Sequence, residues 1–251
     1  MINYDHLLAL AKTAAQNAIY SLLELEKAEH TFFYDSALPR EMKVSVDYQL
    51  EMGIIEILKE TGIPIISEEA GDYNLDYVGG LRWIVDPLDG SVNFFRGLPN
   101  SATSIALWRD EFPIFGVICE YPSCKLIWGG KSYGAFLDGK LLQVSAIDKK
   151  NEAVLCTGFP SRFNFSNSSI ESFLDSAKSY AKVRMMGAAS ISLFNLAKGS
   201  ADVYLEDDIM IWDVAAGIAI VEGAGGRVMI QSGRFPNSMN IQVDNGLILK
   251  R

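Results

Sequence analysis

The sequence predicts a layered α/β protein, because two different rhythms of secondary structure follow one another along the chain. Apolar runs joined by short turns are typical of an antiparallel sheet, and they occupy residues 101–109, 113–120, 125–129 and 134–137. From about residue 153 strand-like and helix-like segments alternate, which indicates helices layered on a sheet. Nothing near residue 145 resembles a linker, so we expect two closely packed lobes, 1–145 and 146–251.

The N-terminal lobe begins with two amphipathic helices. Leu8, Ala11, Ala15, Ile19 and Leu22 keep helical spacing within residues 6–23. A second apolar face runs from residue 46 to the Thr-Gly pair at 61–62, where we expect that helix to end. Between them, residues 28–45 have mixed character and predict a mobile loop or hairpin. Short buried strands are expected at 63–66 and 82–86, separated by a glycine-rich loop.

In the C-terminal lobe the predicted elements alternate strictly. Strands are expected at 153–158, 182–186, 201–205 and 227–230, and helices at 168–181, 190–199 and 212–226.

Composition and charge exclude several classes of function. A formal net charge of −9 argues against nucleic acid or an anionic membrane as a partner. No apolar run is long enough to span a membrane, and the N-terminus lacks the basic start of a signal peptide, so we expect a cytoplasmic protein. His6 and His30 are the only histidines, and no GxSxG motif is present, which argues against a Ser-His-Asp hydrolase. The three cysteines have neither zinc-site nor disulfide-framework spacing.

Three acidic residues follow short apolar strands and predict a cation site. Glu68, Asp86 and Asp89 each come just after such a strand, so neighbouring strands deliver them into one cleft. Carboxylates that close together raise one another's pKa unless protons or metal ions are shared among them. Oxygen ligands select hard cations such as Mg²⁺. The fixed φ of Pro87 would also hold the Leu88 carbonyl in position to join them.

The next two residues, Gly90 and Ser91, predict a phosphate-binding segment. Glycine permits close backbone approach, and residues 91–97 could start a short helix whose free N–H groups face the cleft. The alternative is that DPLDG is an ordinary polar turn with Ser91 as a helix N-cap.

These motifs together resemble a known enzyme family. WIVDPLDGSVNF (83–94), with ISEE (66–69) before it and WDVAAGIAIVEGAGG (212–226) far after it, closely resembles the signature segments of the inositol monophosphatase family. The resemblance covers nearly the whole chain. It implies an αβαβα five-layer sandwich of the inositol monophosphatase and fructose bisphosphatase type, commonly a homodimer. It also implies a Mg²⁺-dependent, lithium-sensitive phosphatase that cleaves phosphate monoesters.

Carried over by position, the resemblance assigns ligands for two metal ions. Glu68, Asp86 and the Leu88 carbonyl match the ligands of the first ion, and Asp86, Asp89 and Asp213 match those of the second. Two or three Mg²⁺ ions per site are implied. Asp213 is also expected near the positively polarised N-terminus of the helix at 212–226.

Further residues match catalytic and substrate-binding positions of the family. Asp47, with Glu68 and Ser91, is implied to help order the attacking water, although an N-cap would equally explain an aspartate there. Ser91 replaces the threonine that most members carry. The positions implied to touch substrate are Asp89, Gly90, Ser91, Gly187, Ala188, Ala189, Glu206 and Asp213. For Glu206, an exposed acidic turn with Asp207 and Asp208 is the competing interpretation.

The expected reaction is hydrolysis of a phosphate monoester of a small polyol, an inositol monophosphate or a related sugar phosphate, by metal-activated water. A bisphosphate-specific relative acting on fructose 1,6-bisphosphate or adenosine 3',5'-bisphosphate, or a histidinol-phosphate phosphatase, stays open. Arg162 borders the expected cleft and could bind a second phosphate, which would favour a bisphosphate substrate. The alternative is that it is an ordinary exposed arginine. A metal-dependent regulatory or scaffold protein without turnover is the alternative of another class.

Overall fold

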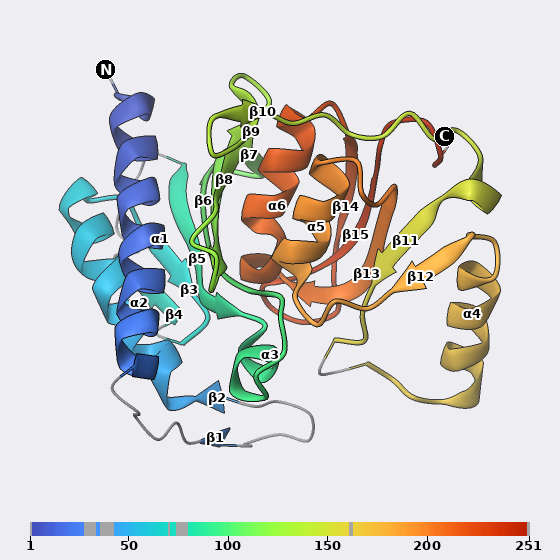
Figure 1. Cartoon of the computed structure of the whole chain (residues 1–251), viewed down its shortest axis with the longest axis horizontal. Coiled ribbons are helices and arrows are strands. Elements are labelled where there is room, and N and C mark those ends of the chain that lie inside the picture. The colour runs from blue at the N-terminus through green and yellow to red at the C-terminus, as the bar shows by residue number, and fades with distance from the viewer. Residues whose placement is uncertain are drawn as a thin grey trace.

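The chain folds into five layers, as expected. The computed structural model describes residues 2–27, 34–35, 43–69, 71–73, 80–160 and 163–249. Helices α1 (Tyr4–Lys27) and α2 (Ser45–Leu58) cover one face of the larger sheet, and α5 (Ala189–Ala197) and α6 (Ile211–Gly223) lie between the two sheets (Figure 1). Helix α4 (Asn167–Ala177) covers the outer face of the smaller sheet (Figure 1). The predicted αβαβα sandwich is therefore confirmed.

The larger sheet has eight strands in the order β10-β9-β8-β7-β6-β5-β3-β4, and all neighbours are antiparallel except β3 and β5. Its strands are β3 (Ile65–Ser67), β4 (Gly71–Tyr73), β5 (Leu81–Asp89), β6 (Ser101–Arg109), β7 (Phe112–Tyr121), β8 (Leu126–Gly130), β9 (Gly134–Leu137) and β10 (Lys140–Leu141).

The smaller sheet has the order β12-β11-β13-β15-β14. Its strands are β11 (Val154–Thr157), β12 (Lys182–Arg184), β13 (Val203–Met210), β14 (Arg227–Ser232) and β15 (Ser238–Asp244). Strand β11 pairs in parallel with β12 and β13, whereas β15 is antiparallel to both of its neighbours. Strand β15 was not among the predicted elements, although Met239, Ile241 and Val243 alternate with polar residues as in a half-buried strand.

The remaining elements are short: α3 (Ser91–Phe95), the 3₁₀ turns η1 (Lys59–Thr61) and η2 (Lys150–Glu152), and the strand pair β1 (Tyr34–Asp35) and β2 (Lys43–Val44). That pair and Ser45, the first residue of α2, are the described part of the 28–45 segment, and the rest of the segment lies outside the described residues. No helix within the described ranges is long and apolar enough to cross a membrane.

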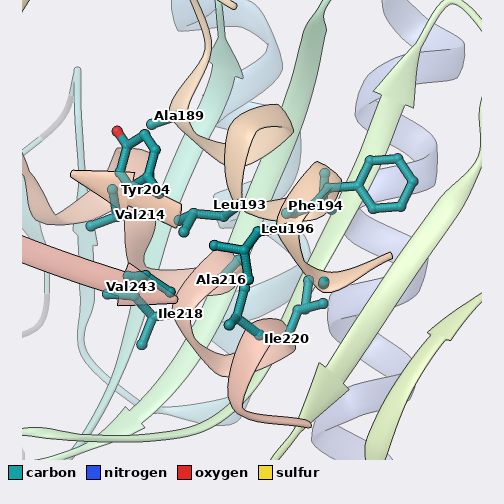
Figure 2. Close-up of a cluster of buried hydrophobic side chains, with 14 of the residues drawn as sticks. Ala189, Leu193, Phe194, Leu196, Tyr204, Val214, Ala216, Ile218, Ile220 and Val243 are labelled. Atoms are coloured by element: carbon teal, nitrogen blue, oxygen red, sulfur yellow. The ribbon is translucent and has the colours of Figure 1, made fainter. Parts of the chain in front are cut away.

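Helix α6 forms the centre of the core. Its side chains are apolar nearly all round, as suits a helix covered by a sheet on each side. Figure 2 shows α6 residues such as Ala216 and Ile218 packed with Leu193 of α5 and with Tyr204 and Val243 of the smaller sheet. On the other side Gly116 of β7 lets the helix approach closely, since a Cβ there would lie 2.2 Å from the Ala216 carbonyl oxygen. This close packing fixes the first turn of α6, which carries Asp213.

The predicted division into lobes 1–145 and 146–251 stays a prediction. The apolar cluster around α6 includes Ile84 and Trp108 of the larger sheet together with Tyr204 and Val243 of the smaller one.

Candidate active site

Three carboxylates from three elements meet at one end of the larger sheet. Glu68 follows β3, Asp86 lies in β5, and Asp213 lies in the first turn of α6. Strands β3 and β5 are parallel neighbours, so residues at their C-terminal ends lie side by side. One carboxylate oxygen from each of the three residues lies within 4.8 Å of the others. The distance is short enough for one metal ion to bind all three.

A β-bulge explains how Asp86 and Asp89 can face the same site although they lie three residues apart. In a regular strand residues three apart point to opposite faces. The structure differs here from the predicted turn after Asp86: β5 continues to Asp89, with a register shift against β6 between these two residues. A bulge adds one residue to one of the two strands, so Asp86 and Asp89 point to the same face of the sheet although they are three positions apart. Thr103 stabilises the irregular stretch by donating a hydrogen bond to the Pro87 carbonyl at 2.8 Å.

The turn itself begins at Gly90. This residue has φ +81°, and a Cβ would lie 2.5 Å from the Asn100 carbonyl oxygen, so glycine is required. Gly90 is the N-cap of α3 and Ser91 is its first residue, which excludes the alternative that Ser91 is the N-cap.

The carboxylate of Asp89, the last residue of β5, contacts the start of α5, a contact that no sequence pattern predicts. The backbone N–H of Ser190 donates to Asp89 Oδ2 at 2.7 Å, and the Ser190 hydroxyl donates to the same oxygen. Burial raises the Asp89 pKa to about 6, although these hydrogen bonds and those from the Ala189 and Gly90 amides act in the opposite direction. The carboxylate is thus held in place before any ligand binds.

Burial and neighbouring like charges raise the pKa values of two carboxyl groups in the cluster. Burial, followed by repulsion from Glu68, Asp89, Asp213 and Asp47, raises the pKa of Asp86 well above its usual value. Burial and the neighbouring carboxylates raise the Asp213 pKa in the same way, while a hydrogen bond with Asp86 lowers it. No Lys, Arg or His is among the described residues that line the cavity. Carboxylate oxygens gathered in this way form a donor set that could hold a metal ion.

The carboxylates lie in a cavity of about 620 Å³, a usual size for a small-molecule site. The cavity brings together most of the residues that the sequence analysis singled out: Glu68, Asp86, Leu88, Asp89, Gly90, Ser91, Gly187, Ala188, Ala189, Glu206 and Asp213. Arg162 lies outside the described residues.

Asp47 is not among the residues that line the cavity. It is buried, with 6% of its surface exposed, and it is close enough to Asp86 to raise the pKa of that carboxyl. Helix α2 begins at Ser45, two residues earlier, so Asp47 belongs to the first turn and is not an N-cap.

Glu206 lies in β13, and its carboxylate lines the cavity. The Tyr204 hydroxyl donates to Glu206 Oε2 at 2.6 Å, and burial raises the Glu206 pKa to about 7. Asp207 is exposed, and Asp208 accepts hydrogen bonds from Arg234. The exposed acidic turn considered for Glu206 is therefore wrong for this residue.

Glu51 is a buried carboxylate that the sequence analysis did not identify. It lies one helical turn after Asp47 on α2 and is fully buried. Its Oε1 accepts the Ser67 hydroxyl and, at 3.0 Å, the Glu69 backbone N–H. The residues on both sides of Glu68 thus donate to one oxygen, which fixes the turn that presents Glu68 to the cluster.

Replacing Glu51 with alanine is expected to weaken divalent-cation binding about 10- to 100-fold, the usual cost of losing a group that orients a metal ligand. Glu51→Gln keeps an acceptor oxygen for both donors and should retain most of the affinity. Calorimetric titration of the metal-free protein with Mn²⁺ measures both variants. Equal affinity in Glu51→Ala and wild type would show that Glu68 does not depend on this turn.

The comparisons with known proteins agree with the geometry. The sequence profile of the Inositol monophosphatase family matches residues 3–249. Phosphatase IMPL1, a chloroplastic protein of Arabidopsis thaliana, is 29% identical over 98% of this chain and 69% of that protein. The fructose-1,6-bisphosphatase/inositol-1-monophosphatase of Aquifex aeolicus is 36% identical over 58% of this chain and 55% of that protein. That alignment therefore spans little more than half of the Aquifex relative.

The three-dimensional comparison leads to the same group of proteins. The crystal structure of the extragenic suppressor protein SuhB from Bartonella henselae superimposes with a TM-score of 0.86 at 28% identity, over 96% of this chain and 94% of that one. Since the family profile spans nearly the entire sequence and the carboxylates converge in the fold, the chain belongs to the inositol monophosphatase family of phosphoric monoester hydrolases.

Proposed function

We propose that this protein hydrolyses the phosphate monoester of a small polyol, an inositol monophosphate or a related sugar phosphate, with two or three Mg²⁺ ions bound. The observation that carries the proposal is the convergence of Glu68, Asp86 and Asp213 within 4.8 Å, in a cavity of about 620 Å³. The names of the relatives support the substrate class, since the Aquifex protein is named for both an inositol and a sugar phosphate.

The donor set fits Mg²⁺. All candidate side-chain ligands are carboxylates, and oxygen donors suit a hard cation that keeps part of its water. Glu68, Asp86 and the Leu88 carbonyl would hold one ion, and Asp86, Asp89 and Asp213 another. When bound, Mg²⁺ supplies positive charge for the phosphate oxygens and lowers the pKa of a coordinated water.

The protein's own residues orient the reactants. Asp47 of α2 and Ser91 of α3 would orient the attacking water. Glu206, held by Tyr204, would accept a hydrogen bond from a hydroxyl of the leaving alcohol. Gly187, Ala188 and Ala189 form the wall at the start of α5. Because alkyl phosphate esters hydrolyse very slowly in water, alignment and charge neutralisation carry most of the catalysis.

A panel of phosphate esters tests the proposal directly. Phosphate release is measured from inositol 1-phosphate, glucose 6-phosphate, fructose 1,6-bisphosphate, adenosine 3',5'-bisphosphate and histidinol phosphate at millimolar Mg²⁺. We expect turnover of the polyol monophosphates, its loss in EDTA, its return when Mg²⁺ is restored, and inhibition by lithium.

Other outcomes would favour the alternatives. A strong preference for a bisphosphate would favour a bisphosphate-specific phosphatase, and a strong preference for histidinol phosphate would favour a histidinol-phosphate phosphatase. Absence of phosphate release from every ester, in a protein that still binds Mg²⁺, would favour a regulatory or scaffold role. The homodimer and the cytoplasmic location stay predictions from the sequence.

A further inference from the structure

Asp89 is distinguished among the candidate metal ligands by the way its carboxylate is held. The backbone N–H and the side-chain hydroxyl of Ser190 both donate to Asp89 Oδ2. A carboxylate oxygen offers two lone-pair sites, so these two donors occupy both sites of Oδ2. Asp86, in comparison, accepts the Leu88 backbone N–H on its Oδ1, at 3.0 Å. In Asp89, Oδ1 is therefore the oxygen that remains for a ligand.

The contact between Ser190 and Asp89 is a fixed part of the fold. Ser190 is the second residue of α5 and is fully buried, and Asp89 is buried as well. Helix α5 packs tightly against α6, since a Cβ on Gly217 of α6 would lie 2.5 Å from the Leu193 side chain of α5. Neither partner has room to turn away, so a ligand that enters the cavity meets Asp89 with Oδ2 already occupied.

Asp89 also lies outside the tightest group of carboxylates. In the part of the chain that the structure describes, that group consists of Glu68, Asp86 and Asp213, and Asp89 is not a member of it. The charge of Asp89 nevertheless raises the pKa of both Asp86 and Asp213, so it lies close to them. Its carboxylate is thus held by α5 beside the cluster, with one oxygen left for an ion shared with those two aspartates.

The number of oxygens that a carboxylate offers affects which cation it suits. Mg²⁺ is small and requires a nearly ideal octahedral arrangement of single oxygen ligands. Ca²⁺ takes about six to eight oxygens in a flexible arrangement and can bind both oxygens of one carboxylate. A carboxylate limited to one oxygen therefore satisfies Mg²⁺ and withholds a ligand from Ca²⁺.

We infer that Ser190 sets the cation preference of the site: by occupying Oδ2 it makes Asp89 a one-oxygen ligand, which favours Mg²⁺ over Ca²⁺ at the second ion. This inference rests on the metal assignment of the proposed function and deepens it. Ser190 is a positioning residue, because it acts through Asp89 and not on the substrate.

Competition between cations tests the inference without any substrate. Mn²⁺ is bound to the metal-free protein and displaced with Mg²⁺ or with Ca²⁺, while electron paramagnetic resonance follows the free Mn²⁺. Ser190→Ala opens one lone-pair site of Oδ2 and keeps the backbone N–H. We expect the Mg²⁺ affinity to fall about tenfold, as is usual when a group that orients a metal ligand is lost. The Ca²⁺ affinity should be retained or rise, so the ratio of the two affinities should fall at least about tenfold.

Two further variants separate cation preference from folding. Ser190→Cys makes the same test at nearly unchanged side-chain volume, and it should lower the ratio too, because a thiol is a weak donor. Ser145→Ala is the matched control. The Ser145 hydroxyl donates to Asp202, another buried carboxylate, and neither residue lines the cavity, so the ratio should not change.

The outcomes distinguish this inference from the proposed function. An unchanged ratio in Ser190→Ala and Ser190→Cys, or an equal loss of both affinities, would overturn the role of Ser190. Mg²⁺-dependent phosphate release by the wild-type protein would still uphold the proposed function in that case. A wild-type protein that binds no Mn²⁺ would instead overturn the metal assignment and the inference with it.

Discussion

Asp213→Asn is expected to lower the Mg²⁺-dependent kcat/KM by about a thousandfold, because a bound metal ion contributes several kcal/mol of transition-state stabilisation. The residue belongs to the three-carboxylate cluster, and close packing of α6 between the sheets prevents another group from moving into its place. The substitution preserves size and removes one negative charge. Steady-state phosphate release over a range of Mg²⁺ concentrations measures the loss.

The same variant should gain stability when no metal is present. Burial and the neighbouring carboxylates raise the Asp213 pKa, so its charged form opposes folding. Asp207→Asn is the matched control: it makes the same change in an exposed residue that does not line the cavity. We expect near-wild-type activity and stability from this control. Activity within a few-fold of wild type in Asp213→Asn would contradict the metal assignment.

The second large effect is that the metal-free protein becomes less stable as pH rises from about 5 to about 8. The pKa values of Asp89 and Glu206 are raised to about 6 and about 7, and those of Asp86 and Asp213 are raised as well. Between the unfolded-state pKa values near 4 and these folded-state values, the folded protein holds more protons than the unfolded chain. Stability therefore falls as pH rises through this window.

The size of this effect follows from the two numerical values. Each of Asp89 and Glu206 contributes roughly 3 kcal/mol that is present below pH 4 and lost above the folded-state pKa. If the proposed metal assignment is right, millimolar Mg²⁺ should restore stability at pH 8, because an ion that binds only the folded carboxylates stabilises the folded state. Urea unfolding at several pH values, in EDTA and in Mg²⁺, measures both effects.

The Asn variants provide the internal check on this pH dependence. Asp213→Asn should flatten the slope of stability against pH in EDTA and reduce the stabilisation by Mg²⁺ at pH 8, whereas Asp207→Asn should leave both unchanged. A metal-free protein that is equally stable at pH 5 and pH 8 would show that the carboxylates do not repel one another in the fold.

The five layers were predicted from the resemblance to a known family. The meeting of Glu68 with Asp86 was predicted from the residues themselves, because acids that follow apolar runs lie at the ends of neighbouring strands. Glu51 could not be found in this way. Helical periodicity treats a charged residue beside an apolar face as exposed, yet this one is fully buried against Ser67 and the Glu69 amide. Ser190 was missed for a related reason: its contact with Asp89 joins residues 101 positions apart, and no local pattern reports such a pairing.

The strand ends were also less predictable than the strands themselves. A proline and two aspartates suggested a turn after Asp86, but β5 continues to Asp89 because Thr103 and the irregular pairing with β6 accommodate Pro87. In β13 the acidic run 206–208 likewise remains in the sheet through a register shift, and the bond between Asp208 and Arg234 holds it there. In both places contacts with residues distant in sequence keep the chain in the sheet, although the local sequence favours a turn.

Because of the register shift in β5, the position of the two aspartates depends more on the number of residues in the DPLDG segment than on which residues they are. Deleting Leu88 would remove the extra residue of the bulge, so that the two aspartates would lie two positions apart and still pair opposite Ser104 and Ala102, but the segment would lose the backbone carbonyl proposed to bind a metal ion. Evolution can therefore exchange side chains within this segment more easily than it can change the number of residues between the two acids.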